Sequence, residues 1–378
     1  MICKLGDICT KIGSGATPRG GKEAYCSKGV SLVRSQNVLD FTFSQDGLAF
    51  INDEQAKKLN NVEVFDGDVL LNITGDSVAR ACMMDSAFLP ARVNQHVAIV
   101  RGKKDCVLNR YLLYFLQWKR EYLLQLASAG ATRNALTKGM IEQLEIDLPS
   151  LDEQGKIVAL LGALDDKIRL NNKINENLER QAQAIYKSWF VDFKPFDGVL
   201  PTDWREYKLS EFLPVITGKK NANVSSDKGT YPFFSCSQSF SWTDEYSFEG
   251  NAILVAGNGD FNVKWYNGKF EAYQRTYVLI PYNPQLTSWL YYAVKYNLAK
   301  ITSAARGSVI KFITKGNLED FSFYAPSSLE KLEIIETLTC INQAIDCNTQ
   351  ENYRLMHLRD ILLPKLMSGE IDVEDVKI

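Results

Sequence analysis

Two long stretches of the chain carry apolar side chains at alternating intervals of four and three residues. This spacing predicts a helix that is buried along one stripe, and each stretch is about five heptads long. Pro364 is expected to kink or end the last turn of the second helix. The first predicted seam is Ile157, Leu161, Leu164, Ile168, Asn171, Asn175, Leu178 and Ile185, and the second is Ile334, Leu338, Ile341, Ile345, Asn348, Asn352, Leu355 and Leu362.

Each seam carries two asparagines near its middle. An asparagine in a seam lowers stability unless it meets a polar partner, so it selects one register over slipped alternatives. A striped helix does not persist alone in water, and the obvious partner is the second helix of the same chain. If the two helices run antiparallel, Asn171 and Asn175 meet Asn348 and Asn352. The alternative is that these asparagines are solvated on loosely packed helices.

The segments outside the long helices form an internal repeat. The string TKG at 137–139 recurs at 314–316, and NQH at 94–96 is echoed by YQR at 273–275. Short β-branched runs bounded by turn residues predict strands in both copies, and each copy then continues into a shorter helix. The predicted strands are 69–73, 97–100, 252–256 and 277–280, and the predicted shorter helices are 109–127 and 287–302.

Together these patterns predict an α/β (α+β) chain. Two similar globular units are joined by two long antiparallel helices that form an intramolecular coiled coil, with an approximate two-fold relation between the halves. The predicted divisions are a first globular unit at 1–150, a central helical spacer at 151–195, a second globular unit at 196–327, a C-terminal helical spacer at 328–370 and an acidic tail at 371–378.

Composition narrows the class of protein. The 378 residues are 46% hydrophobic and 23% charged, which excludes disorder as the main state. No apolar run approaches membrane-spanning or signal-peptide length, so a cytoplasmic protein without a membrane partner is expected. The net charge is −2, and residues 328–378 alone carry ten acidic against five basic residues. Any surface that binds a polyanion must therefore be a local arrangement within the two globular units.

Signs of catalysis or metal binding are weak. The eight cysteines include no Cys-x-x-Cys pair and the two histidines are far apart, so no metal site is expected. The glycine-rich string at 15–22 has the wrong spacing for a phosphate loop, and Glu23 stands where that loop needs a hydroxyl. The string NPQL at 283–286 lacks the second proline and the aromatic residue known from adenine methyltransferases. We therefore expect no catalytic residue and no bound cofactor.

Loop residues of both units include the side chains that DNA recognition needs. Arg and Lys contact phosphates and guanine, and Asn and Gln contact adenine. Polar loops are also how turns are built, and this is the alternative reading of each residue. His96 is expected to be a hydrogen-bonded loop residue. The candidates are Arg19, Lys22, Arg34, Gln36, Asn37, Thr74, Arg80, Arg92, Asn94, Gln95 and Arg133 in the first unit, and Lys219, Lys220, Asn223, Gln238, Asn258, Asn262, Lys264, Gln274, Arg275, Arg306 and Lys311 in the second.

The chain as a whole resembles the specificity subunit of type I restriction-modification enzymes. The resemblance covers the whole chain in order, including the duplication. It rests on GATP at 15–18, LPSLDEQ at 148–154, IYKSWFVDF at 185–193 and LLPKLMSGEI at 362–371.

The resemblance implies a DNA-reading subunit with two target recognition domains, one for each half of a split site. Two modification subunits, each binding S-adenosylmethionine, would dock on the helices and methylate adenine in double-stranded DNA, and a restriction and translocation subunit would join them. Because the two units differ in sequence, the two half-sites should differ as well. Two alternatives stay open: an interaction scaffold that does not read DNA, and a self-contained restriction-modification enzyme.

Overall fold

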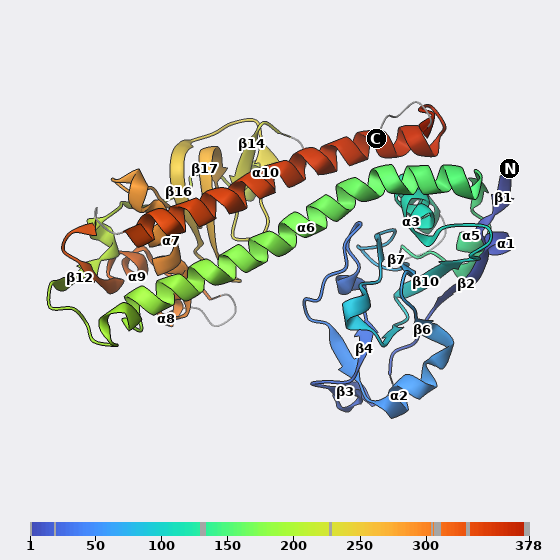
Figure 1. The fold of residues 1–378 in the computed structure, drawn as a ribbon, viewed down its shortest axis with the longest axis horizontal. Coiled ribbons are helices and arrows are strands. Elements are labelled where there is room, and N and C mark those ends of the chain that lie inside the picture. Colours follow the sequence, from blue (N-terminus) through green and yellow to red (C-terminus); the bar gives the residue numbers. More distant parts are fainter. Residues whose placement is uncertain are drawn as a thin grey trace. The chain divides into compact units, whose positions relative to one another are not determined.

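The computed structural model describes residues 2–18, 20–128, 134–226, 229–303, 305, 311–329 and 333–373, without the side chains of 21 and 22. The chain forms two compact units, one of Met1–Arg169 with Glu351–Ile378 and the other of Leu170–Gln350. Helix α6 (Leu151–Phe190) and helix α10 (Glu333–Met367) each contribute one half to each unit (Figure 1). The predicted five-part division is not tested by this partition and stays a prediction.

The first unit contains a four-stranded and a five-stranded sheet. The four-stranded sheet is antiparallel, in the order β2 (Cys9–Ser14), β10 (Val97–Gly102), β7 (Val69–Asn72) and β8 (Ala81–Met83). The five-stranded sheet has the order β3 (Tyr25–Cys26), β5 (Ala49–Ile51), β4 (Val30–Val33), β9 (Ala91–Val93) and β6 (Glu63–Val64). The remaining elements are the strand pair β1 (Ile2–Lys4) and β11 (Glu145–Asp147), with helices α1 (Leu5–Ile8), α2 (Asp53–Lys58), α3 (Asn109–Trp118), α4 (Arg120–Ser128) and α5 (Lys138–Glu142).

The second unit repeats this plan. Its six-stranded sheet has the order β13 (Val215–Thr217), β18 (Thr276–Leu279), β16 (Phe248–Ala256), β17 (Val263–Ala272), β14 (Tyr231–Phe234) and β15 (Ser241–Thr243). The first four strands of this order correspond one by one to the four-stranded sheet of the first unit. The remaining elements are the strand pair β12 (Trp204–Lys208) and β19 (Ser322–Pro326), with helices α7 (Thr287–Tyr296), α8 (Leu298–Thr302) and α9 (Lys315–Glu319). The predicted duplication of one unit is therefore confirmed.

The elements predicted from local patterns are present at the predicted places. The four predicted strands are β7, β10, β16 and β18. Each predicted shorter helix is broken once, at Lys119 between α3 and α4 and at Asn297 between α7 and α8. In the part of the chain that is described, no helix is both long and apolar enough to cross a membrane.

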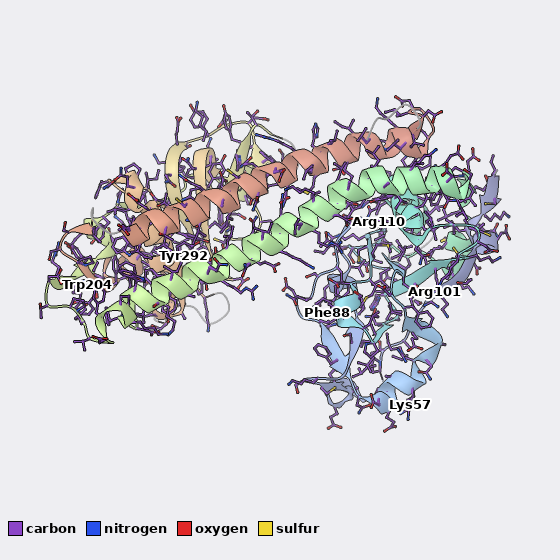
Figure 2. The ribbon with its side chains drawn as sticks, in the orientation of Figure 1. Lys57, Phe88, Arg101, Arg110, Trp204 and Tyr292 are labelled. Atoms are coloured by element: carbon purple, nitrogen blue, oxygen red, sulfur yellow. The ribbon has the colours of Figure 1, made fainter. Side chains whose placement is uncertain are left out.

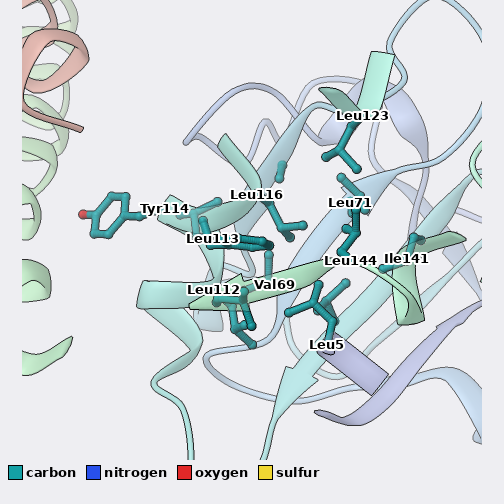
Figure 3. Close-up of a cluster of buried hydrophobic side chains, with 14 of the residues drawn as sticks. Leu5, Val69, Leu71, Leu112, Leu113, Tyr114, Leu116, Leu123, Ile141 and Leu144 are labelled. Atoms are coloured by element: carbon teal, nitrogen blue, oxygen red, sulfur yellow. The ribbon is translucent and has the colours of Figure 1, made fainter. Parts of the chain in front are cut away.

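The long helices belong to the cores of the units that they join. The main core of the first unit packs the strand residues Val69 and Leu71 against Leu112 and Leu116 of α3 (Figure 3). Both long helices add buried side chains to this core, namely Ile157 and Leu161 from α6 and Leu363, Leu366 and Met367 from α10. The second unit is built in the same way, with Ala182, Tyr186 and Phe190 from α6 and Ile335, Leu338 and Ile341 from α10.

A hydrogen bond ties each shorter helix to a long helix. In the first unit the Tyr114 hydroxyl donates to Asp165 Oδ2 at 2.7 Å. In the second unit the Tyr292 hydroxyl, on α7, donates to Asn342 Oδ1 at 2.6 Å (Figure 2). The first unit adds an ion pair in which Arg110 Nη2 lies 3.0 Å from Asp166 Oδ1, and hydrogen bonding to this guanidinium lowers the pKa of Asp166.

Contacts within each unit show that α6 and α10 run antiparallel, as predicted. In the first unit Asp165 lies 3.0 Å from Arg359, and Lys167, further along α6, lies 3.1 Å from Glu351, which is earlier in α10. In the second unit Asn175 lies 2.8 Å from Asn348, and the Tyr292 hydroxyl is hydrogen-bonded both to Glu179, further along α6, and to Asn342, which is earlier in α10. None of the predicted seam residues is exposed. The approximate two-fold relation between the halves stays a prediction.

The seam asparagines of the second unit meet as predicted. Asn348 Nδ2 donates to Asn175 Oδ1 at 2.8 Å, and Asn175 Nδ2 lies 3.4 Å from both Ile345 O and Thr349 Oγ1. A polar pair of this kind favours one register, because a slipped register would leave both amides in an apolar seam. The alternative that these two asparagines are solvated on loosely packed helices is wrong.

Pro364 was expected to kink or end the second helix, and the expected end is wrong because α10 continues to Met367. The expected kink stays a prediction. Proline removes only its own N–H from the helix, and the Pro364 carbonyl still accepts a bond from Ser368 N at 3.0 Å. Burial of Leu363 and Leu366 in the first core holds this last turn in place. Gly369, with a φ of +75°, provides the left-handed conformation that ends a helix.

Candidate nucleic-acid interface

In the first unit several loops meet at one end of strands β7 and β10. Ile73 N donates to His96 O at 3.0 Å and Gly75 N donates to Asn134 O at 3.1 Å, while Leu136 N donates back to Ile73 O at 2.8 Å. These bonds connect loops that are far apart in the sequence. We call this group the first loop cluster, and it comprises residues 15–18, 34–37, 73–80, 94–96 and 134–136.

The second unit makes the same connections at the ends of β16 and β18. Gly257 N donates to Arg275 O at 2.8 Å, Gly259 N donates to Lys311 O at 3.0 Å, and Ile313 N donates to Gly257 O at 2.9 Å. The equivalence of His96 and Arg275 is the one that the repeat predicts. We call this group the second loop cluster, and it comprises residues 218–223, 235–238, 257–262, 273–275 and 311–313.

Three buried asparagines hold the first loop cluster together. Asn72, which is 0% exposed, donates from Nδ2 to Ser35 O at 2.9 Å and to Val38 O at 3.1 Å. These bonds fasten the turn at 34–37 to the end of β7. Because these bonds are made inside the fold, the amide contributes to stability as well as to position.

The other two asparagines correct the sequence analysis. Asn37 donates to the carbonyls of Ser44 and Asp46 and accepts from Arg34 N at 3.0 Å, and Asn94 accepts from His96 N at 3.0 Å. Both side chains are buried. Both were predicted to be DNA-binding residues on exposed loops. The predicted exposure is wrong, because both amides are buried and hydrogen-bonded to backbone groups of the turns.

Arg92 is a further correction. It lies on strand β9 and is only 6% exposed. Its guanidinium donates to Ala56 O at 3.2 Å and to Asn60 Oδ1 at 3.0 Å, and it forms a 3.2 Å ion pair with Glu63. The expected position on an exposed loop is therefore wrong, and Arg92 instead connects β9, β6 and the end of α2.

The remaining described candidates of the first unit lie at the surface of the first loop cluster. Gln36 and Gln95 are exposed, and Arg34, Thr74 and Arg80 are half-buried. A neighbouring loop orients two of them, because Arg34 Nη2 donates to Gly47 O at 2.5 Å and Gln36 Nε2 donates to the same carbonyl at 3.2 Å. These side chains are held in place before any ligand is bound.

The second loop cluster is richer in exposed cations. Lys219, Asn223, Gln238, Gln274, Arg275 and Lys311 are exposed, and Asn258 is half-buried. Lys220 is partly neutralised by Glu245, 2.7 Å away, and hydrogen bonding to that carboxylate raises the pKa of Lys220. Asn262 is a correction like Asn37, because it is buried and donates to the carbonyls of Cys236 and Asp260.

Lys264 is an unusual cation that lies next to the second loop cluster. It is half-buried at the start of β17, where its ammonium donates to Ser235 O at 3.4 Å and to Asn262 Oδ1. Desolvation by burial lowers the pKa of Lys264 to about 8. Its charge is therefore sensitive to pH in the range where other lysines stay protonated.

Arg19, Arg133 and Arg306 lie outside the described residues, as does the side chain of Lys22. Thr17, which the list of DNA-binding candidates omitted, does belong to the first loop cluster. Its Oγ1 donates to Gln95 Oε1 at 2.7 Å, and both ring nitrogens of His96 are hydrogen-bonded. The expected hydrogen-bonded role of His96 is confirmed. No local sequence pattern predicts the contact between Thr17 and Gln95, because 78 residues separate them.

Among the described residues, no three His, Cys, Asp or Glu side chains come together as a metal site would require. The geometry of both clusters is instead that of polar loops presented by a rigid sheet, which is a common way to build a binding surface.

Comparison with known proteins identifies both halves of the repeat. A family model described as the type I restriction modification DNA specificity domain matches residues 1–180 and 201–357. The EcoDI specificity subunit of a type I restriction enzyme from Escherichia coli is 39% identical over 181 residues, which is 47% of this chain and 40% of that protein. The MjaIX specificity subunit from Methanocaldococcus jannaschii is 22% identical over 99% of this chain and 94% of its own. The fold is similar to the crystal structure of an S subunit from M. genitalium, with a TM-score of 0.60, 15% identity, and coverage of 97% of this chain and 95% of that chain.

Proposed function

Because the chain belongs to the family of type I restriction modification DNA specificity domains, we propose that it reads an asymmetric, split DNA site, one half with each loop cluster. The observation that carries this proposal is the pair of loop clusters, which have the same backbone hydrogen bonds and different side chains. Equivalent backbones place residues at equivalent points of the DNA, and different side chains select different bases.

The equivalent positions 96 and 275 illustrate the difference between the clusters. His96 in the first cluster has a ring that can both donate and accept, whereas Arg275 in the second offers only donors. The neighbouring residues, Gln95 and Gln274, are alike and exposed. One half-site is therefore expected to differ from the other while sharing its general geometry.

Catalysis is assigned to partner proteins. We propose that two modification subunits carry S-adenosylmethionine and methylate adenine, that a restriction subunit joins through them, and that this chain binds no cofactor of its own. Apolar side chains exposed on the long helices support such docking. Within the second unit these are Leu170 and Ile174 of α6, and within the first unit they are Leu358 and Ile361 of α10.

The proposal is tested by expressing the full chain with its modification subunit in a host that lacks other adenine methyltransferases. Methylation-sensitive sequencing of the host DNA should show methylated adenine in one split motif whose two halves differ. The modification subunit alone serves as the control and should produce no such motif. A complex that assembles but leaves the DNA unmodified, or that marks an unbroken motif, would contradict the proposal.

Lys264 predicts how binding of the second half-site depends on pH. With a pKa of about 8, Lys264 is cationic below that pH and can contact a phosphate, and it becomes neutral as the pH rises. The affinity of the assembled complex should therefore fall as the pH rises above 8. The slope of log affinity against log salt should become shallower by about 0.9, as expected for the loss of one phosphate contact.

The matched variants are Lys264→Arg and Lys219→Arg. Arginine stays charged throughout this range, so Lys264→Arg should flatten the pH profile. Lys219 is exposed in the same cluster, and Lys219→Arg should leave the profile as in the unaltered chain. A profile of equal steepness in all three proteins would show that Lys264 takes no part in binding.

A further inference from the structure

Four side chains of the first loop cluster form a continuous hydrogen-bonded chain. Thr17 Oγ1 donates to Gln95 Oε1 at 2.7 Å, Gln95 Nε2 lies 2.8 Å from His96 Nε2, and His96 Nδ1 lies 2.6 Å from Thr74 Oγ1. The chain begins and ends on loops that the sheet holds in place. Gln95, in the middle, is exposed, and the His96 ring behind it is half-buried.

The chemistry of these groups fixes the direction of the chain. The Gln95 amide nitrogen can only donate, so His96 Nε2 is the acceptor. A neutral His96 ring then carries its proton on Nδ1 and donates it to Thr74 Oγ1. At the other end the Thr17 hydroxyl donates to Gln95 Oε1. The two bonds hold the plane of the Gln95 amide in place. A 180° rotation of the amide would require the Thr17 and Thr74 hydroxyls and the His96 ring to reverse their donor and acceptor roles together.

The Gln95 amide still has hydrogen-bonding groups that a ligand can use. Its amide nitrogen has two hydrogens, and its oxygen accepts two bonds. The chain uses one of each, so one donor and one acceptor of this exposed group stay available. In the major groove adenine presents an acceptor at N7 beside a donor at N6, and a glutamine amide complements this pair with two bonds.

We propose that Gln95 reads the adenine of an A·T pair in the first half-site and that Thr17 and His96 are positioning residues that orient its amide. This inference rests on the proposed function, and it assigns one base of the first half-site to one residue of the chain. Fixing the amide before binding also lowers the entropy that a free glutamine side chain would lose on contact with DNA.

The second loop cluster provides an internal comparison. Gln274 occupies the equivalent position and is also exposed, but its neighbour is Arg275. A guanidinium has no acceptor and cannot take a hydrogen bond from the glutamine amide as His96 Nε2 does. The inference is therefore specific to the first half-site.

The test uses the full chain with its modification subunit and reads the methylated motif of host DNA. Gln95→Ala should relax a single A·T position in one half of the motif, with roughly a 10- to 100-fold loss of discrimination there, and should leave the other half unchanged. Gln95→Glu removes the donor and should shift the preference at that position toward a C·G pair, because a carboxylate accepts from cytosine N4. Gln274→Ala, the matched control, should leave the first half unchanged.

The positioning residues are tested by variants that keep their shape. Thr17→Val removes the hydroxyl and should relax the same position as Gln95→Ala, whereas Thr17→Ser should restore discrimination. His96→Phe should act like Thr17→Val if the variant keeps its thermal unfolding midpoint. Because Thr17 is exposed, Thr17→Val tests the orientation even if His96→Phe fails to fold.

The outcomes separate the two proposals. If the unaltered complex yields no split motif, the proposed function fails. If the split motif is present but Gln95→Ala leaves every position intact, or relaxes a G·C position, the assignment of Gln95 to adenine is overturned while the function stands. Full discrimination in Thr17→Val with loss in Gln95→Ala would keep Gln95 as the reader and overturn the positioning role of Thr17.

Discussion

Exchanging the first unit for that of a relative should replace the bases of one half of the methylated motif and leave the other half as it was. The reason is that the first loop cluster rests entirely on elements of the first unit. The structure also says where the exchange should be made. That unit consists of residues 1–169 together with 351–378, because Ile157 and Leu161 of α6 and Leu366 of α10 lie in its main core.

A shorter exchange of residues 1–150 alone should therefore fold less well than the full exchange. It would leave these helix residues to pack against a foreign core, and misfits of this kind cost about 1–3 kcal/mol each. The measurements are the sequenced motif and the thermal unfolding of each chimera with its modification subunit. A chimera that alters both halves of the motif would contradict the assignment of one half to each unit. Equal stability of the two chimeras would show that the packing of these helix residues against the first core adds nothing to the stability of the unit.

The features that could be predicted from sequence depend on local spacing. The heptads of both long helices predicted their extent, because a helical stripe repeats within a few residues. The same spacing placed Asn175 and Asn348 in facing seams, and once the helices were taken to be antiparallel their contact followed. The end at Pro364 was misplaced, because proline weakens a helix locally and the burial of Leu363 and Leu366 outweighs that effect.

The candidate site was harder to predict because burial of a polar side chain depends on distant backbone groups. The polar sequence around Asn37 and Asn94 suggests exposed amides. In the fold, however, both amides are hydrogen-bonded to backbone carbonyl or N–H groups of nearby turns. Arg92 lies in a short, largely apolar run two residues after Pro90, which is a weak hint that it belongs to a strand. The Thr17 contact to Gln95 depends on two loops that only the folded sheet brings together.

Removing the partner of the buried Asp68 should give the largest loss of stability in the first unit. Arg101, on β10, donates to both carboxylate oxygens of Asp68 at 2.6 Å, and Asp68 also accepts from Phe65 N at 2.7 Å (Figure 2 labels Arg101). The Asp68 side chain is 0% exposed and that of Arg101 is 21% exposed. An unpaired Asp68 carboxylate has no route to water, whereas an unpaired guanidinium can turn toward it.

The two single variants are therefore expected to differ. Arg101→Met should destabilise the first unit by about 3–5 kcal/mol, and Asp68→Asn, which keeps an acceptor for Phe65 N, should cost less. The double variant should be more stable than Arg101→Met alone, because it buries no unpaired charge. The measurement is urea unfolding of the full chain, with hydrogen exchange of β7 and β10 to assign the transition to the first unit. Lys208→Ala breaks an exposed ion pair with Asp320 in the second unit and should leave the unfolding midpoint close to that of the unaltered chain.

The order of the single variants should reveal which charge causes the loss. Arg101→Met leaves the buried Asp68 carboxylate without its partner, whereas Asp68→Asn leaves a partly exposed guanidinium, so Arg101→Met should be the less stable of the two. Because β7 and β10 carry the loops at 73–80 and 94–96, the same Arg101→Met variant should lose discrimination in the first half of the motif before the second. A deficit that is equal in the two single variants would mean that lost packing, and not an unpaired carboxylate, sets the stability of this sheet.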